Sequence, residues 1–140
     1  MMDKDCYLID IPSHREFDGV LSVMEGPDTL PFDVKRVFWV HDTADGAVRG
    51  NHATINTKLV LVAVSGSFNV TVDDGREKNT FHLDNSEKGL FINNMIWRSM
   101  SNFKDNCVVM AFCDRIYACG GGTETIDNYA EFLMAKKKLE

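Results

Sequence analysis

Short runs of β-branched and aromatic residues, separated by turns, dominate this chain from Lys35 to Ile116. The runs at 34–40, 59–64 and 68–72 are typical of strands. A tight hairpin turn is predicted at Asp73-Asp74-Gly75, because Gly75 can adopt the positive φ that such a turn requires. Many short strands in succession predict an antiparallel sandwich or barrel rather than a helical or α/β protein.

The remaining elements are weaker but follow the same pattern. Further strands are predicted at 77–83, 89–92, 96–100 and 107–113, and two short ones at 7–11 and 20–24 around the turn at Asp18-Gly19. After a break at Gly120-Gly121-Gly122, Tyr129, Phe132 and Leu133 form one apolar stripe at helical spacing. We expect a helix over about 126–138, capped by Thr125 or Asp127 and packed on the barrel; membrane or partner binding by this helix is the alternative.

Length and charge limit what the chain can do. Its 140 residues fit a single domain, with the barrel over about 20–117. The net charge of −6 with scattered basic residues argues against nucleic acid as a partner. The longest apolar run, 59–64, is too short to span a bilayer, and the N-terminus has no signal-peptide stretch. We therefore expect a cytoplasmic protein with no membrane contact, whose four cysteines, without a C-x-x-C pair, are buried apolar residues.

The segment Arg49-Gly50-Asn51-His52-Ala53-Thr54 is the most informative for function. Metal-binding cupins carry G-x5-H-x-H-x3,4-E-x6-G and a further histidine in a second segment, and strand alternation points both H-x-H side chains into the barrel. Here only His52 matches, since the other ligand positions fall on Thr54, Lys58 and Arg98. One ligand of four predicts no bound metal, and no cofactor is expected.

A lone histidine in a strand is commonly a packed or surface residue. Thr54 on the same face, and Trp97 and Arg98 in the second segment, would make the barrel interior more polar than packing requires. His52 is thus a candidate general acid/base that needs no metal. His41-Asp42 is a weaker candidate in a turn, His82 is expected to face outward, and His14 to lie in a polar loop.

The chain resembles the WxcM-like nucleotide-sugar 3,4-ketoisomerases, which have a cupin (RmlC-like) jelly-roll fold. The resemblance covers residues 31–117 and rests on six motifs in the same order, namely Pro31-Phe32-Asp33-Val34-Lys35-Arg36-Val37, Arg49-Gly50-Asn51-His52-Ala53, Ser65-Gly66-Ser67, Val72-Asp73-Asp74-Gly75, Trp97-Arg98-Ser99-Met100 and Asp105-Asn106-Cys107-Val108-Val109-Met110. It implies an all-β cupin barrel and a dTDP-linked 4-keto-6-deoxy sugar as ligand. It also implies proton transfers between C3 and C4, a homodimer that exchanges N-terminal strands, and a role in surface polysaccharide biosynthesis.

The sequence departs from the family pattern R-G-x-H-A-H, in which two histidines share the proton transfers. The second histidine is Thr54, the tyrosine pair is Phe38-Trp39, and a usual glutamine is Leu59. A threonine does not accept protons at neutral pH, so the two-histidine mechanism cannot operate unchanged. We expect His52 to be the catalytic acid/base, and the substrate-binding residues to be Arg36, Trp39, Arg49, Asn51, Thr54, Trp97 and Arg98. The alternative is a cupin that binds a nucleotide sugar or a protein partner without turnover.

Overall fold

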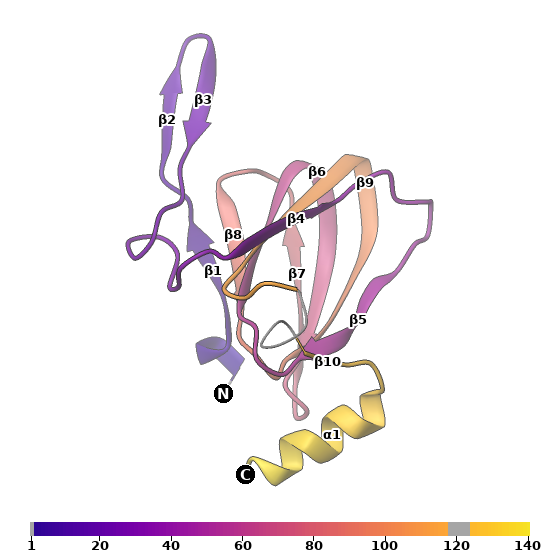
Figure 1. The fold of residues 1–140 in the computed structure, drawn as a ribbon. Coiled ribbons are helices and arrows are strands. Elements are labelled where there is room, and N and C mark those ends of the chain that lie inside the picture. The colour runs from indigo at the N-terminus through magenta and orange to yellow at the C-terminus, as the bar shows by residue number, and fades with distance from the viewer. Residues whose placement is uncertain (1, 118–123) are drawn as a thin grey trace.

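The computed structural model describes residues 2–117 and 124–140, and its main feature is one antiparallel sheet that curls into a half-barrel (Figure 1). The strand order is β1-β8-β6-β9-β5-β10, with β4 added to β9 and β7 to β6. These eight strands are β1 (Cys6–Asp10), β4 (Arg36–Val40), β5 (Arg49–Thr54), β6 (Leu59–Asp73), β7 (Lys78–Leu83), β8 (Lys88–Ile92), β9 (Trp97–Cys113) and β10 (Thr125–Ile126). The predicted all-β architecture with a short C-terminal helix is confirmed, and the sheet also takes in β1, upstream of the range expected for the barrel.

The two long strands β6 and β9 pair along most of their length and form the spine of the sheet. The sequence suggested two strands in each of these regions, because Ser65-Gly66-Ser67 and residues 101–106 look like breaks. In the structure they are bulges within continuous strands, where the register shifts between Ala63 and Asn69. Gly66 has φ +65°, and a Cβ there would lie 2.2 Å from the Lys104 carbonyl oxygen, so only glycine fits this close crossing.

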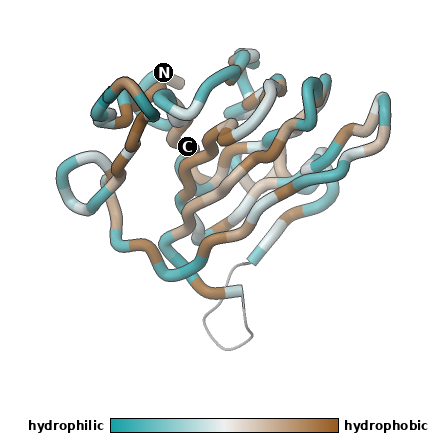
Figure 2. The backbone as a smooth tube through the Cα atoms, turned by 90° about the horizontal axis from the view of Figure 1, so that it is seen from above, coloured by the Kyte–Doolittle hydropathy of each residue, from teal (hydrophilic) through white to brown (hydrophobic). Residues whose placement is uncertain are grey.

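Alternation along the strands divides the apolar residues between the two faces of the sheet. The interior face carries the larger cluster, which includes Leu61, Phe68, Val70 and Leu90, all less than 3% exposed. A smaller cluster around Val60 and its neighbours lies on the opposite face and includes side chains from residues 24–32. Figure 2, viewed from above, shows hydrophobic residues recurring along the strands between polar turns.

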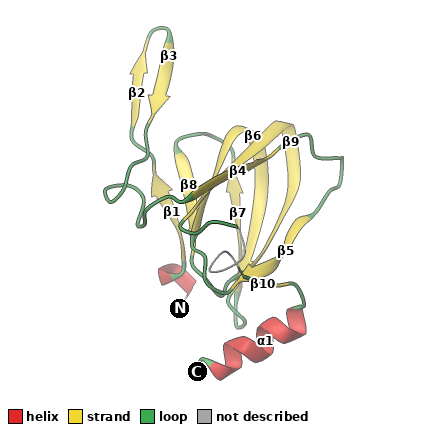
Figure 3. Cartoon of the chain, viewed as in Figure 1, coloured by secondary structure: helices red, strands yellow, loops and turns green. Residues whose placement is uncertain are grey.

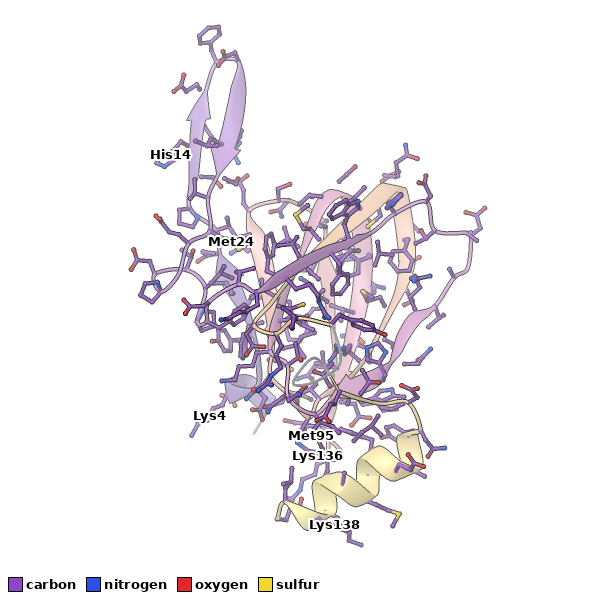
Figure 4. The ribbon with its side chains drawn as sticks, in the orientation of Figure 1. Lys4, His14, Met24, Met95, Lys136 and Lys138 are labelled. Carbon is purple, nitrogen blue, oxygen red and sulfur yellow. The ribbon has the colours of Figure 1, made fainter. Side chains whose placement is uncertain are left out.

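The N-terminal region contains a second, two-stranded sheet of β2 (Ser13–Glu16) and β3 (Gly19–Ser22), which projects away from the half-barrel (Figures 1 and 3). The turn at Asp18-Gly19 was predicted, but the strand before it was not, because SHRE is polar throughout and gives no apolar alternation. His14, expected in a loop, lies on β2 and points away from the body of the protein (Figure 4).

The C-terminal helix α1 (Tyr129–Lys138) lies below one end of the half-barrel (Figure 3). Its cap is Asn128, whose side chain accepts a hydrogen bond from the Glu131 N–H at 3.0 Å. The predicted start at 126 is wrong, because Thr125 and Ile126 pair with β5 as β10. The predicted caps Thr125 and Asp127 are also wrong, since Asn128 caps the helix. Buried Phe132 anchors the helix to the barrel, as the apolar stripe predicted.

Three cysteines, Cys6, Cys107 and Cys113, are buried free thiols, as predicted, whereas Cys119 and the glycine break at 120–122 lie outside the described residues. A short 3-10 helix η1 (Met2–Lys4) precedes β1. Neither helix of the described chain has the length and apolar character needed to cross a membrane.

Candidate active site

The candidate site begins with the pairing of His52 on β5 with Arg98 on β9. Directly opposed residues of an antiparallel pair project to the same face, and Arg98 also pairs with buried Val72, which belongs to the interior cluster. The Arg98 side of the pair is buried, with 6% of the residue exposed, and His52 is half-buried. The expectation that these two side chains share the interior face is therefore met.

A bulge in β5 sets the position of His52. The register shifts between Gly50 and His52, with Gly50 at φ +91° and Asn51 at φ +56°. A Cβ at Gly50 would lie 3.0 Å from the Arg98 carbonyl oxygen, so glycine allows β5 to approach β9 closely at this point. Bulges of this kind redirect a side chain beside a functional site.

The imidazole of His52 is held by one hydrogen bond, between Nδ1 and the Gly50 carbonyl oxygen at 3.1 Å. A carbonyl only accepts, so Nδ1–H is the donor in this pair and Nε2 of the neutral ring is left as an acceptor. Burial lowers the pKa of His52, and the positive charge of Arg98 lowers it further, against the opposing effects of the Gly50 hydrogen bond and the charge of Asp127. His52 is thus neutral near pH 7 and can act as a base through Nε2.

Thr54, which replaces the second histidine, has a structural role. Its hydroxyl donates to the Thr57 carbonyl oxygen at 2.7 Å and accepts from Nη1 of Arg98 at 3.2 Å. Both groups are buried, and Thr54 is only 2% exposed. The hydroxyl therefore fixes the Arg98 guanidinium and does not offer a free proton to a ligand.

Two guanidinium groups in this region have no carboxylate partner among the described residues. Burial lowers the pKa of Arg98 to about 10. Arg36 on β4 makes one weak contact, from Nη2 to the Cys113 sulfur at 3.5 Å, while its buried Nε and Nη1 find no partner in the described chain. Buried, unsatisfied donors of this kind are suited to an anionic or strongly polar ligand.

Aromatic rings flank the Arg36 guanidinium. Its Cζ lies 5.4 Å from the Phe38 ring centroid and 5.3 Å from that of Tyr117. Tyr117 and Cys113 were not predicted to belong to the site. The alternation that places Arg36 and Phe38 on one face could have identified their shared orientation, but the approach of Tyr117 depends on the chain after β9, for which the sequence gives no signal.

The two predicted tryptophans do not join this group. Trp97 is adjacent to Arg98 on β9 and projects to the opposite face, where its ring lies 5.2 Å from Tyr129 and 5.7 Å from Phe132 between centroids. Trp39 is 57% exposed and alternates with Phe38, which packs against the interior cluster. Trp97 therefore anchors the helix, and its predicted role in binding the substrate is not supported by its position.

The groove that Trp39 lines lies between the loop 41–48 and residues 101–108 of β9 and has a volume of about 1300 Å³. His41 also lines it and bonds to Asp42 at 2.5 Å, an exposed pair on the turn where it was predicted. Arg49 and Asn51, the other predicted binding residues, are exposed at the start of β5. Neither contributes to the hydrogen bonds around His52 and Arg98.

The donor set of the site does not suit a metal ion. Within residues 2–117 and 124–140, no three His, Cys, Asp or Glu side chains gather where they could hold one. The residue opposite His52 is Arg98, whose positive charge would repel a cation. The arrangement instead combines a neutral histidine base with two guanidinium groups, which suits proton transfer on a substrate that develops negative charge.

This fold and site define the chain as a cupin-type protein of the sugar-nucleotide ketoisomerase class, as comparison with known proteins shows. The family model FdtA, described as WxcM-like, C-terminal, matches residues 4–137. The chain belongs to this family.

Individual relatives agree with the family assignment. The chain is 33% identical over 122 residues to the TDP-4-oxo-6-deoxy-alpha-D-glucose-3,4-oxoisomerase of Aneurinibacillus thermoaerophilus, covering 87% of each chain. The structure of WlaRA, a TDP-fucose-3,4-ketoisomerase from Campylobacter jejuni, is similar with a TM-score of 0.87 and 30% identity over 96% of this chain and 97% of that one. QdtA, a sugar 3,4-ketoisomerase from Thermoanaerobacterium thermosaccharolyticum in complex with TDP, has a TM-score of 0.89 and 27% identity over 96% of each chain.

Proposed function

We propose that this protein is a 3,4-ketoisomerase of a dTDP-linked 4-keto-6-deoxy sugar, with His52 as its acid/base. The observation that carries the proposal is the His52–Arg98 pair on the interior face of β5 and β9, accompanied by the unpaired guanidinium of Arg36. Family membership supports the reaction class, since the relatives include a TDP-4-oxo-6-deoxy-glucose 3,4-oxoisomerase. A mutant of the 3,4-ketoisomerase QdtA has been crystallised in complex with TDP-4-keto-6-deoxyglucose, which supports the choice of ligand.

The reaction requires one proton to leave C3 and one to arrive at C4. Nε2 of His52 takes the C3 proton, the C3–C4 double bond forms, and the electrons of the C4 carbonyl move to its oxygen to give an enediolate. The remaining hydroxyl proton moves from the C3 oxygen to the C4 oxygen. Return of a proton from the imidazolium to C4 then leaves the carbonyl at C3, with no net oxidation or reduction.

Arg98 and Arg36 supply positive charge where the substrate is negative. The enediolate and the diphosphate both accept charge-assisted hydrogen bonds, and a guanidinium binds either in a fixed fork geometry. Arg98 is held in place by Thr54, so its orientation exists before the ligand arrives. A pre-organised charge of this kind stabilises the enediolate more than the neutral ketone, which lowers the barrier.

A second candidate function is binding of the nucleotide sugar without turnover. It is favoured by Thr54, whose hydroxyl is occupied by Thr57 and Arg98, and by Phe38, which lacks the phenol of the family pattern. Under this alternative the guanidinium groups still bind the ligand, but the proton transfer between the two oxygens has no protein group to assist it. The two functions make different predictions for the substrate in heavy water.

The test is to incubate the protein with TDP-4-keto-6-deoxyglucose in D2O and follow the sugar by proton NMR. An isomerase forms the 3-keto product and incorporates solvent deuterium at C3 of recovered substrate or C4 of product. A binder shifts the thermal unfolding midpoint with TDP, since a ligand at 100 times its Kd stabilises by about 2.7 kcal/mol, but incorporates no deuterium. If the protein shows no deuterium exchange and TDP causes no thermal shift, both functions are refuted.

We also propose that the protein is a homodimer in the cytoplasm, where it serves the biosynthesis of surface polysaccharide. The projecting β2–β3 hairpin supports the dimer, because a two-stranded hairpin alone is marginally stable and this one exposes Phe17, Val20 and Leu21. Sedimentation velocity tests this: Leu21→Asp should dissociate the dimer, whereas Val48→Asp, at an exposed valine outside the hairpin, should not. A wild-type monomer would refute it.

A further inference from the structure

The edge strand β10 brings the segment before the C-terminal helix alongside His52. It pairs antiparallel with β5, with Thr125 opposite Thr54 and Ile126 opposite Ala53. The pairing is continued by a hydrogen bond from the Ile55 N–H to the Glu124 carbonyl oxygen at 2.8 Å. In the same register the residue after Ile126 falls opposite His52, and this residue is Asp127.

The alternation of β10 places Asp127 on the side of the sheet where His52 lies. Ile126 shares the face of Ala53, so the residues on either side of Ile126 share the face of Thr54 and His52. Asn128 is extended, with φ −108° and ψ 123°, and the helix begins only at Tyr129. Asp127 therefore directly follows the paired residues of β10 and precedes the helix.

The carboxylate of Asp127 is available for this role. Helix capping is carried out by Asn128, whose Oδ1 accepts from Glu131, so Asp127 is not needed as a cap. Within the described chain the Asp127 carboxylate makes neither a hydrogen bond nor an ion pair. It is an exposed, uncommitted negative charge beside the histidine.

We propose that Asp127 is a positioning residue for His52. The Asp127 carboxylate stabilises the imidazolium that forms when His52 accepts the C3 proton. The inference rests on the proposed role of His52 as the base. Among the residues that the structure describes, two charged groups act on the imidazole: Arg98 from β9 disfavours the protonated ring, and Asp127 from the segment after β10 favours it. A carboxylate in this place partly offsets Arg98, so that His52 remains basic enough to take a proton from carbon.

Asp127 supports a site that has one histidine where the family pattern has two. Thr54 occupies the second position and is committed to Arg98. Electrostatic support for His52 comes instead from the segment after β10, 75 positions further along the chain than His52 (127 minus 52). The C-terminal segment is thereby part of the catalytic arrangement as well as of the fold.

The experiment compares Asp127→Asn with Glu131→Gln, which removes the same charge from the first turn of α1. The imidazole of His52 is titrated by NMR in the intact protein, and the pH profile of kcat/KM is measured alongside. In Asp127→Asn the pKa of His52 should fall, and the acid limb of kcat/KM should move to lower pH with it. The plateau value of kcat/KM should fall about tenfold, while KM should change little. Asp127→Glu should restore both, and Glu131→Gln should resemble wild type.

An unchanged His52 titration in Asp127→Asn, or an equal shift in Glu131→Gln, would overturn the inference. Because the titration needs no substrate, it separates this inference from the proposed function. A protein with no ketoisomerase activity but a displaced His52 titration in Asp127→Asn would refute the function and leave the electrostatic pairing established. Asp127 is exposed, so the variant should fold, which circular dichroism and the unfolding midpoint check.

Discussion

Arg98→Met should make the protein more stable and less active. Burial lowers the pKa of Arg98 well below the usual range of an arginine, to about 10, and no carboxylate among the described residues compensates for this. A depression of this size corresponds to roughly 3 kcal/mol of unfavourable folding free energy at neutral pH. Methionine retains much of the aliphatic packing, and the lost hydrogen bond to Thr54 costs about 1 kcal/mol.

The net expectation is a rise of about 2 kcal/mol in the free energy of unfolding, or about 7 °C in Tm for a chain of this length. Urea unfolding followed by tryptophan fluorescence at pH 7.5 measures it, with Arg49→Met as the control at an exposed arginine that should change stability by less than about 0.5 kcal/mol. Ketoisomerase activity should be lost in Arg98→Met.

The pH dependence of this effect has a definite sign. The folded state binds its proton at Arg98 less tightly than the unfolded state, so the cost of burying the charge is present in full below about pH 10 and is relieved as the pH rises above it. The stability advantage of Arg98→Met should therefore shrink above pH 10. A variant that is less stable than wild type at pH 7.5 by more than about 1 kcal/mol would refute the reasoning, because Arg98 would then be needed to hold the fold together.

Three further predictions concern the core, the crossing of the long strands and the base. Phe132→Ala, at 0% exposure, should lower the free energy of unfolding by about 3–4 kcal/mol, against less than about 1 kcal/mol for Leu133→Ala at 36% exposure, both by urea unfolding. Gly66→Ala should lower the free energy of unfolding by more than about 2 kcal/mol, because the added Cβ would lie 2.2 Å from a carbonyl oxygen. Gly46→Ala, also at positive φ but in open space, should lower it by about 1 kcal/mol. Equal effects would show that backbone strain alone is responsible. Since burial and Arg98 lower the pKa of His52, the acid limb of kcat/KM should have its midpoint below 6.5, and a midpoint above 6.5 would contradict the described environment.

The strand pattern predicted most of the fold because β-branched alternation reports directly on which face of a strand is buried. It failed at β2, where SHRE has no apolar face and the strand exists only through pairing with β3. It also divided β6 and β9 at positions that are bulges, since Ser65-Gly66-Ser67 has the composition of a turn while its glycine allows two strands to cross closely. Local composition does not distinguish a turn from a bulge when the partner strand is unknown.

The candidate site was predictable where it depended on alternation and not where it depended on contacts distant in sequence. His52, Thr54 and Arg98 could be assigned to one face from strand periodicity, and they lie together. Trp97 could have been excluded by the same rule, because it neighbours Arg98 and must face the other way. Asp127 was considered only as a helix cap, since nothing in its local sequence indicates that β10 pairs with β5.

The central claim is that the sugar ring binds on the interior face between His52, Arg98 and Arg36. A crystal structure of the His52→Gln variant with TDP-4-keto-6-deoxyglucose tests it most directly. We predict that C3 of the sugar lies beside position 52, with the C3 and C4 oxygens or the diphosphate within hydrogen-bonding distance of the Arg98 and Arg36 guanidinium groups. A sugar bound in the groove beside Trp39, with no contact to either guanidinium group, would contradict the account.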